Sequence, residues 1–226
     1  LGADDVKVGW QGKELRFDVG TKFTFNPAEA TRLVGMAGAC EMTSGAIDFE
    51  AFKINELGAA AAFGLAENYL AAKVGLLFNG DTMRGGIFFG RTCSLDPLLL
   101  VDPDVAKVLP APNPTLTGIY GYGQAFIPIV NVGCLFNLSA NAGAGIFAFQ
   151  EDNTIGGKML VGASARAICA VNVGGEIILV GVKAGNDFNF LGSGRIYGSA
   201  GVKPLKVSFD KKVTLTYKNQ KWDYDY

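Results

Sequence analysis

Apolar and polar residues alternate along most of the second half of the chain. Within residues 134–149 the even positions hold Cys, Phe, Leu, Ala and Ile, whereas the odd positions mix Asn, Ser and Gly with apolar residues. Residues 157–173 show the same pattern, with Met, Val and Ala at the odd positions. A period of two is typical of β-strands with one apolar face. We therefore expect long strands whose alternate side chains turn inward and meet another layer.

Turn residues between these runs predict how the strands pair. Gly174 and Gly175 are typical of a two-residue hairpin turn, which would place Val171 opposite Ile178. Because a shift of one residue would turn a whole strand inside out, keeping the apolar faces together fixes the register.

The next joint allows two registers. A two-residue turn at 185–186 would place Glu176 opposite Arg195, whereas a loop one residue longer would let Val182 meet Phe190 and continue the apolar face. Burial of a row of apolar side chains outweighs one exposed ion pair, which is worth at most about 1 kcal/mol. The longer loop is therefore predicted.

The first half of the chain predicts a second meander. Four strand candidates lie within residues 46–90, and the Asn-Gly dipeptide at 79–80 is a strong hairpin signal that would pair Leu76 with Met83. The Ala-rich segment 58–66 suits a helix on propensity, but its glycines favour a strand.

The N-terminal 45 residues predict short strands and one short helix. The strands lie within residues 6–25. Asn26 is a suitable N-cap and Pro27 suits the first helical turn, so a helix to about Met36 is predicted, with a loop as the alternative.

Residues 91–115 form a connector rich in Asp and Pro. Asp102 is a candidate N-cap followed by a proline, and the helix that it begins should end at Leu109. Asp96, Asp102 and Asp104 are candidate calcium ligands, but their spacing matches no EF-hand loop, and capping explains Asp102 without a metal.

The chain is therefore predicted to be an all-β protein, with two long-stranded antiparallel meanders forming a sandwich or open barrel and one or two short helices in the connectors. Its parts are residues 1–45 (short strands, helix and loop), 46–90 (first meander), 91–115 (connector) and 116–226 (second meander), all within one compact domain of a larger protein. At the end of the chain, Trp222, Tyr224 and Tyr226 share one strand face. That pattern is typical of the last strand of an outer-membrane barrel and equally of a half-buried terminal strand in a soluble sandwich.

Composition excludes several kinds of chemistry. Because 49% of its residues are hydrophobic, the chain can form a large core. The 31 glycines suit bends within long strands. The net charge of -1 and the lack of a basic cluster argue against nucleic-acid binding. The absence of histidine excludes a Ser-His-Asp triad, a Cys-His dyad and His-ligated zinc, and no cofactor is expected.

The first residues of the chain bear on whether it is a mature product or part of a longer protein. It lacks an initiator Met and resembles no signal peptide, so the chain is expected to be a processed product or an excerpt of something longer.

Four cysteines permit two disulfides. The polar tip 150–153 would place Cys134 opposite Cys169, which leaves Cys40 and Cys93 to pair by elimination. Four buried, reduced cysteines are the alternative, and no C-x-x-C spacing indicates a metal site.

Two further groups are candidates for function. Tyr120, Tyr122 and Phe126 form an aromatic row for an apolar groove, although packing of the two tyrosines over Ala142 and Ala144 is favoured.

Asp48 and Glu50 share a strand face and form the one carboxylate pair that acid/base chemistry on glycosides would need. A solvated sheet face is the favoured interpretation of this pair.

The expected function is non-enzymatic: a structural or interaction β-domain of a larger extracellular or cell-envelope protein. Its partners would be other domains of the parent protein or further copies of the chain. The alternative is an open barrel that binds an apolar ligand or lipid, or an outer-membrane β-barrel, and it is disfavoured because the predicted apolar faces are rich in Ala and Gly. A carboxylate-based hydrolase ranks third.

Overall fold

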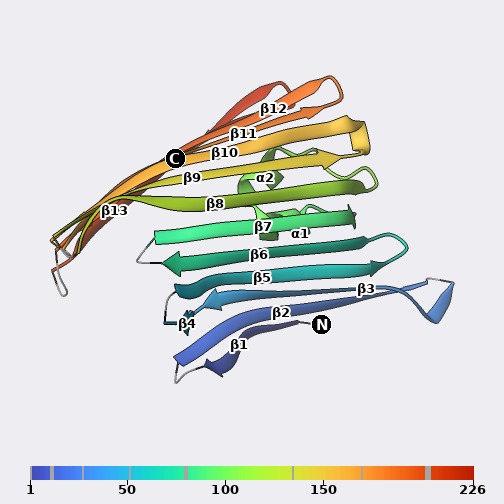
Figure 1. The fold of residues 1–226 in the computed structure, drawn as a ribbon. Coiled ribbons are helices and arrows are strands. Elements are labelled where there is room, and N and C mark those ends of the chain that lie inside the picture. The colour runs from blue at the N-terminus through green and yellow to red at the C-terminus, as the bar shows by residue number, and fades with distance from the viewer. Residues whose placement is uncertain are drawn as a thin grey trace.

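One antiparallel sheet holds most of the chain (Figure 1). The computed structural model describes residues 2–10, 13–26, 28–50, 52–78, 81–133, 135–168, 170–201 and 205–226. The first half contains β1 (Gly2–Trp10), β2 (Lys13–Asn26), β3 (Glu29–Ser44), β4 (Ile47–Phe49), β5 (Phe52–Gly64), β6 (Asn68–Phe78) and β7 (Asp81–Thr92). The connector contains α1 (Asp96–Val101) and α2 (Pro103–Val108). The second half contains β8 (Leu116–Val132), β9 (Phe136–Phe149), the 3-10 turn η1 (Glu151–Asn153), β10 (Thr154–Ala167), β11 (Val171–Ala184), β12 (Asp187–Ala200), β13 (Val207–Lys218) and β14 (Lys221–Asp225).

The strands lie side by side in chain order, except that the short β4 pairs only with β5. The prediction of an all-β protein with long antiparallel meanders and short helices in the connector is confirmed. The two meanders are joined edge to edge, because β7 pairs with β8. Among the described strands β1 and β14 form the two edges of the 14-stranded sheet, which is therefore open.

Both helices pack against the same side of the sheet, which we call the covered face. The opposite side is the uncovered face. The helix α1 lies over β5, β6 and β7, and α2 lies over β11, β12 and β13. The core between helices and sheet contains Leu98, Val101, Val105, Val108 and Leu109 of the connector and Phe88, Tyr120, Phe147, Val180 and Leu191 of the sheet. In the described part of the chain, no helix has the length and hydrophobicity needed to cross a membrane.

Two predicted registers are confirmed. Leu76 lies opposite Met83 in the β6–β7 hairpin. Phe149 lies opposite Thr154 in the β9–β10 hairpin, which is the register that the tip 150–153 predicts. The turn residues at 79–80 lie outside the described residues.

The predicted turn at Gly174-Gly175 is wrong. The β10–β11 turn comes earlier, because Ala167 already pairs with Val171, and both glycines lie inside β11. A Cβ on Gly174 would come within 2.5 Å of the Tyr197 ring on β12. The glycine therefore provides space for a neighbouring ring rather than a turn.

The predicted three-residue loop between β11 and β12 is also wrong. Glu176 lies opposite Arg195, as the rejected two-residue turn requires. Gly185 supplies the left-handed backbone of this turn, with φ of 58°. The register brings Asn189 onto the covered face, where its side-chain nitrogen donates to the Val108 carbonyl at 2.9 Å. A polar residue fits the core here because its hydrogen bond is satisfied.

The β8–β9 register differs from the prediction by three residues. Tyr122 lies opposite Gly145 and Tyr120 opposite Phe147, not opposite the alanines expected. The cause is a later turn, since β8 continues to Val132.

The helix predicted after Asn26 is wrong, because Glu29–Ser44 forms β3 and pairs with β2 and β5 along its two edges. The helix after Asp102 is confirmed and ends at Leu109. The helix α1 was missed, although Pro97 stands in its first turn.

The apolar faces of β9 and β10 do not turn inward. Ile146, Met159 and Val161 lie on the uncovered face and are 74%, 60% and 59% exposed. The mixed face of the same strands is the covered one, and it carries the buried Phe147 and Lys158. The expectation that the apolar face meets another layer is therefore wrong.

Candidate functional site

A single row of paired residues crosses the covered face beneath the connector. From β3 to β10 it alternates a large side chain with glycine, in the order Glu41, Gly58, Lys73, Gly86, Tyr122, Gly145 and Lys158. Each large side chain can lean over the glycine beside it, which brings charged and aromatic groups of alternate strands together.

The glycines of this row are required by close packing. A Cβ on Gly86 would lie 2.7 Å from both the Tyr122 ring and the Val101 side chain of α1. A Cβ on Gly58 would lie 3.0 Å from Lys73, whose ammonium group reaches across Gly58 to the Glu41 carboxylate. Glycine thus lets the helix and the ring approach the sheet.

A buried ion pair fixes the connector to the row. The Nζ atom of Lys158 lies 2.8 and 2.9 Å from the two carboxylate oxygens of Asp102, and their side chains are 9% and 2% exposed. Asp102 also accepts the Tyr120 hydroxyl at 2.5 Å and the backbone N–H groups of Asp104 and Val105 as the N-cap of α2. One carboxylate therefore begins the helix and attaches it to β8 and β10.

The other end of α2 is held as firmly. Lys218 of β13 donates to the carbonyl oxygens of Lys107 at 2.9 Å and Leu109 at 2.6 Å. Burial lowers the pKa of Lys218. A cation at a helix C-terminus complements the helix dipole, so this end of α2 is capped from the sheet, and the N-cap Asp102 is itself bound to the sheet by Lys158 and Tyr120.

Tyr122 of the row and its neighbour Tyr120 both have raised pKa values. Burial raises the pKa of Tyr122 to about 12, and the Asp102 carboxylate acts in the same direction. Burial followed by the charge and hydrogen bond of Asp102 raises the pKa of Tyr120 further. Both hydroxyl groups therefore stay protonated across the physiological range.

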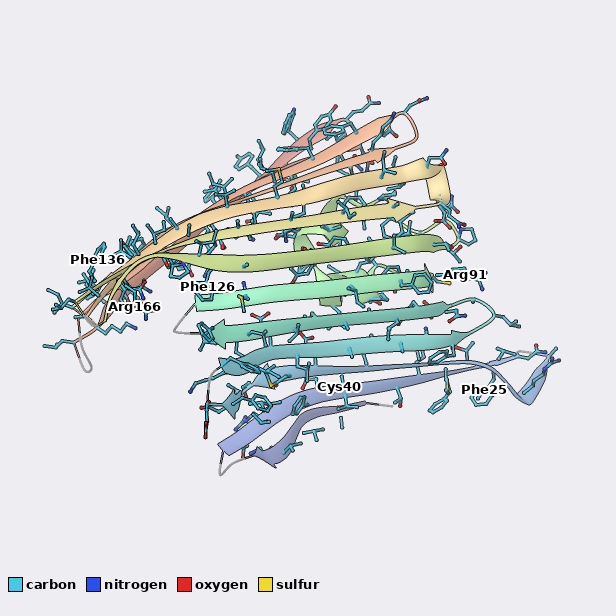
Figure 2. The ribbon with its side chains drawn as sticks, in the orientation of Figure 1. Phe25, Cys40, Arg91, Phe126, Phe136 and Arg166 are labelled. Carbon is cyan, nitrogen blue, oxygen red and sulfur yellow. The ribbon has the colours of Figure 1, made fainter. Side chains whose placement is uncertain are left out.

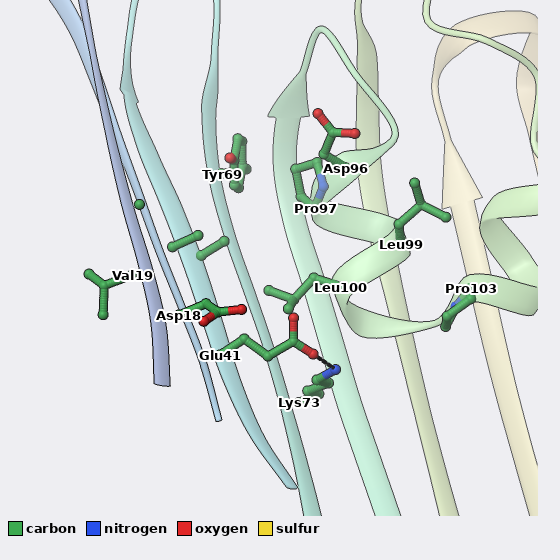
Figure 3. Close-up of a pocket in the computed structure, with 13 residues that line it drawn as sticks. Asp18, Val19, Glu41, Tyr69, Lys73, Asp96, Pro97, Leu99, Leu100 and Pro103 are labelled. Carbon is green, nitrogen blue, oxygen red and sulfur yellow. Dashed lines mark hydrogen bonds and ion pairs between the residues drawn. The ribbon is translucent and has the colours of Figure 1, made fainter. Parts of the chain in front are cut away.

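A groove of about 630 Å³ lies beside α1, where the helices leave the covered face open (Figure 3). Its floor is made of small residues on neighbouring strands, and the α1 side chains Leu99 and Leu100 form a wall. Near the groove, burial and the Glu67 and Asp96 carboxylates raise the pKa of Tyr69. The groove is open to solvent, and both charged and apolar side chains line it.

The calcium candidates do not converge on an empty site. Asp102 and Asp104 both face the ammonium group of Lys158, at 2.8 and 3.3 Å. The lysine ammonium therefore occupies the position that a calcium ion would need. Asp96 accepts the Ser94 hydroxyl at 3.1 Å at the start of α1. The described residues contain no cluster of three or more acidic or cysteine side chains suited to a metal.

The aromatic row is divided between two environments. Tyr120 and Tyr122 stack with ring centroids 5.8 Å apart beneath the connector. Phe126 lies farther along β8 and stacks on Phe78 at 6.0 Å. Tyr122 therefore belongs to the row on the covered face and Tyr120 to the core beside it, rather than to a groove.

The pairing of Cys40 with Cys93 is not formed. Both are free and exposed, and two strands, β5 and β6, lie between β3 and β7. Three strand spacings amount to about 14 Å, beyond the reach of a disulfide. Cys134 and Cys169 lie outside the described residues.

The carboxylate pair is not assembled. Asp48 forms an ion pair with Lys53 at 2.7 Å, and Glu50 lies in the turn after β4. The two groups therefore have different surroundings and no common site.

The uncovered face is broadly apolar. Its large exposed side chains include Phe63, Leu70, Ile87, Phe89, Ile119, Ile146, Met159, Val161, Ile177, Leu179, Phe188, Ile196, Val213 and Leu215. Among the described side chains of β5 to β12, alternation places two charges on this face, Arg91 and Lys183, each one residue from a strand end. Arg91 marks one end of the sheet in Figure 2.

The covered face is charged and polar beyond the helices. Arg84 pairs with Glu56 at 2.7 Å, and Arg195 bridges Glu176 and Asp210. Each of these ions has a partner on the same face. Across β5 to β12 the covered face therefore carries the ion pairs beyond the helices and the uncovered face is apolar, whereas on β13 Lys211 lies on the uncovered face opposite Ile196.

The total accessible surface agrees with this division. It is 13417 Å², whereas a compact monomer of 23.8 kDa would expose about 9,900 Å². An excess of about 3,500 Å² is expected of an open sheet with one face that no second layer covers.

Sequence reasoning missed Lys158 and Lys218 as structural cations. The signal for Lys158 was a lone lysine in an otherwise apolar run, opposite a helix N-cap that the sequence did identify. Nothing local indicated their partners, because Asp102 and Lys158 lie 56 positions apart.

Comparisons of this chain with protein-family models, with curated proteins and with solved structures found no match.

Proposed function

We propose that this chain is a lipid-contacting β-sheet. Its uncovered face lies against acyl chains and its covered face lies against water. The observation that carries the proposal is the segregation of charge: large apolar side chains are exposed on one face, and the ion pairs lie on the other.

Hydrocarbon is the environment that fits such a face. A side chain in lipid loses nothing by being apolar, whereas a charge near the middle of a bilayer costs about 2–4 kcal/mol on a barrel strand. The charges Arg91 and Lys183 lie at strand ends, where long side chains can reach the headgroups. Antiparallel pairing also satisfies the backbone of the strands between the two edges, β1 and β14, as hydrocarbon demands.

Strand length supports the same proposal. The 14 residues of β9, β10, β11 and β12 span about 46 Å, which exceeds the roughly 30 Å of bilayer hydrocarbon. Aromatic side chains lie on the uncovered face near the end that bears the connector, as in the interfacial belts of membrane proteins. The relevant residues are Phe63, Phe89, Phe188 and Trp222.

A protein partner explains this surface less well. A standard interface covers about 800 Å² of each partner, whereas the surface exposed beyond that of a compact monomer is about 3,500 Å². The objection that the apolar faces are rich in Ala and Gly loses force, because large aliphatic and aromatic residues stand between the small ones.

Trp222 allows a direct test, because its ring is 62% exposed on the uncovered side of β14. We expect a Trp10→Phe variant, which keeps Trp222 as its one tryptophan, to float with phosphatidylcholine vesicles. Its fluorescence should shift to the blue and be quenched by brominated acyl chains. Protein that stays monodisperse in plain buffer and does not float would overturn the proposal in favour of a structural or interaction module.

A matched pair of variants on β12 separates the two faces. Ile196→Glu places a charge on the uncovered face and should abolish flotation. Ser199→Glu places the same charge on the covered face of the same strand and should leave flotation unchanged. Equal behaviour of the two variants would contradict a face-specific contact.

A further inference from the structure

The last strand, β14, is an open edge with a self-complementary sequence. Among the described strands its one neighbour is β13, so its outer edge faces no strand, and the Tyr224 N–H donates to the Asp223 side chain at 2.9 Å. Exposed edges of this kind recruit another strand. Lys221, Asp223 and Asp225 share the covered side, and Trp222 and Tyr224 share the uncovered side.

Closure of the sheet on itself is disfavoured by strand direction. Thirteen strands lie on the path from β1 to β14, and every step between neighbours is antiparallel. The two edge strands therefore run in the same direction, and pairing β14 with β1 would join them in parallel. Pairing β14 with the same strand of another copy about a two-fold axis is antiparallel instead.

We propose that β14 pairs antiparallel with β14 of a second copy of this chain, with Asp223 on the two-fold axis. Lys221 of each copy then faces Asp225 of the other, which gives two attractive charge pairs. Trp222 of each copy faces Tyr224 of the other on the uncovered side. The two Asp223 side chains repel each other, but the attractive pairs outnumber them.

This arrangement keeps the two apolar faces on one side. A two-fold axis perpendicular to the sheet turns the uncovered face onto itself, so both copies contact the same lipid surface. In this respect the inference rests on the proposed function. The charge pairing and strand direction that select the second copy do not depend on lipid.

Cysteine cross-linking in vesicles tests the register. The background chain carries serine at the four native cysteine positions. Asp223→Cys should form a disulfide-linked dimer under mild oxidation, because residues facing each other across an antiparallel pair have Cα atoms about 4.5–5.5 Å apart. Lys221→Cys is the matched control: the two copies of position 221 lie about 14 Å apart, so it should remain monomeric.

Mixing and charge exchange complete the test. A mixture of Lys221→Cys and Asp225→Cys chains should cross-link. Adding Lys221→Asp to the Asp223→Cys chain should lower the yield roughly tenfold, and adding Asp225→Lys as well should restore it.

The outcomes distinguish this inference from the proposed function. Asp223→Cys that stays monomeric, or links no better than Lys221→Cys, overturns the paired edge even when the protein floats with vesicles. Register-specific cross-linking in detergent without flotation would support the paired edge and contradict lipid contact.

Discussion

At the residue scale, a few polar side chains decide how the connector is held. Asp102 is an N-cap, a partner for Tyr120 and the counter-ion of Lys158. Because the ion pair of Asp102 and Lys158 is buried, replacing either residue would leave the other charge without a partner. Exposed ion pairs on the same sheet, such as that of Lys53 and Asp48, are screened by water.

Removing Lys158 should therefore be costly. Lys158→Met leaves the Asp102 charge buried without a cation and should lower the free energy of unfolding by about 3–5 kcal/mol. Denaturant unfolding followed by circular dichroism would measure this. Lys53→Met, at a pair that is more exposed than that of Lys158 and Asp102, should cost less, at about 1 kcal/mol. Equal losses in the two variants would refute the role of the buried pair.

Tyr122 predicts a loss of stability at high pH. Its folded-state pKa is raised to about 12, whereas an unfolded tyrosine titrates near 10. The unfolded chain therefore releases this proton first, so the stabilisation is complete below pH 10 and is lost as the pH rises from 10 through 12. Thermal midpoints between pH 9 and 12 should fall less steeply in Tyr122→Phe, and an unchanged slope would show that another group is responsible.

At the scale of elements, Gly58 and Gly86 of the row leave the space in which α1 docks. The sheet would form without them, but the connector would be kept away from it. The same residue type has another role on the uncovered face, where several glycines have open space above them.

Gly86 and Gly85 provide a matched pair for this claim. Gly86→Leu must displace Tyr122 or Val101 and should destabilise the protein by about 1–3 kcal/mol. Gly85→Leu points to the uncovered face, where the nearest atom to its Cβ is a backbone oxygen at 3.5 Å, and should be nearly neutral. Thermal unfolding of both variants measures this. A larger loss of stability in Gly85→Leu than in Gly86→Leu would contradict the assignment of Gly86 to the covered face.

At the scale of the whole molecule, the sheet has no second layer on its apolar side. The core lies between the two helices and the covered face, and the apolar uncovered face of β5 to β12 is exposed. Under the proposed function, lipid covers that face.

Accessibility along β10 should reverse in lipid. Val161→Cys lies on the uncovered face and Ser164→Cys on the covered face, each introduced in a chain that lacks the native cysteines. In vesicles a membrane-impermeant maleimide should label position 164 and spare position 161. Labelling of position 161 in vesicles at its rate in detergent would argue against lipid contact.

The sequence by itself determined most strands other than β3, the β6–β7 and β9–β10 registers and the helix after Asp102. These depend on neighbours in the chain: a period of two, a short turn and an N-cap. Only the tertiary structure decided which face is covered, since alternation shows that two faces differ and not which one meets another layer. It also decided the β8–β9, β10–β11 and β11–β12 registers. In the last two, Tyr197 packs over Gly174, Glu176 faces Arg195, and Asn189 donates to the Val108 carbonyl of the connector. The site follows the same rule, because Lys158 and Asp102 meet through the docking of a helix on a sheet, and no local pattern encodes that distance.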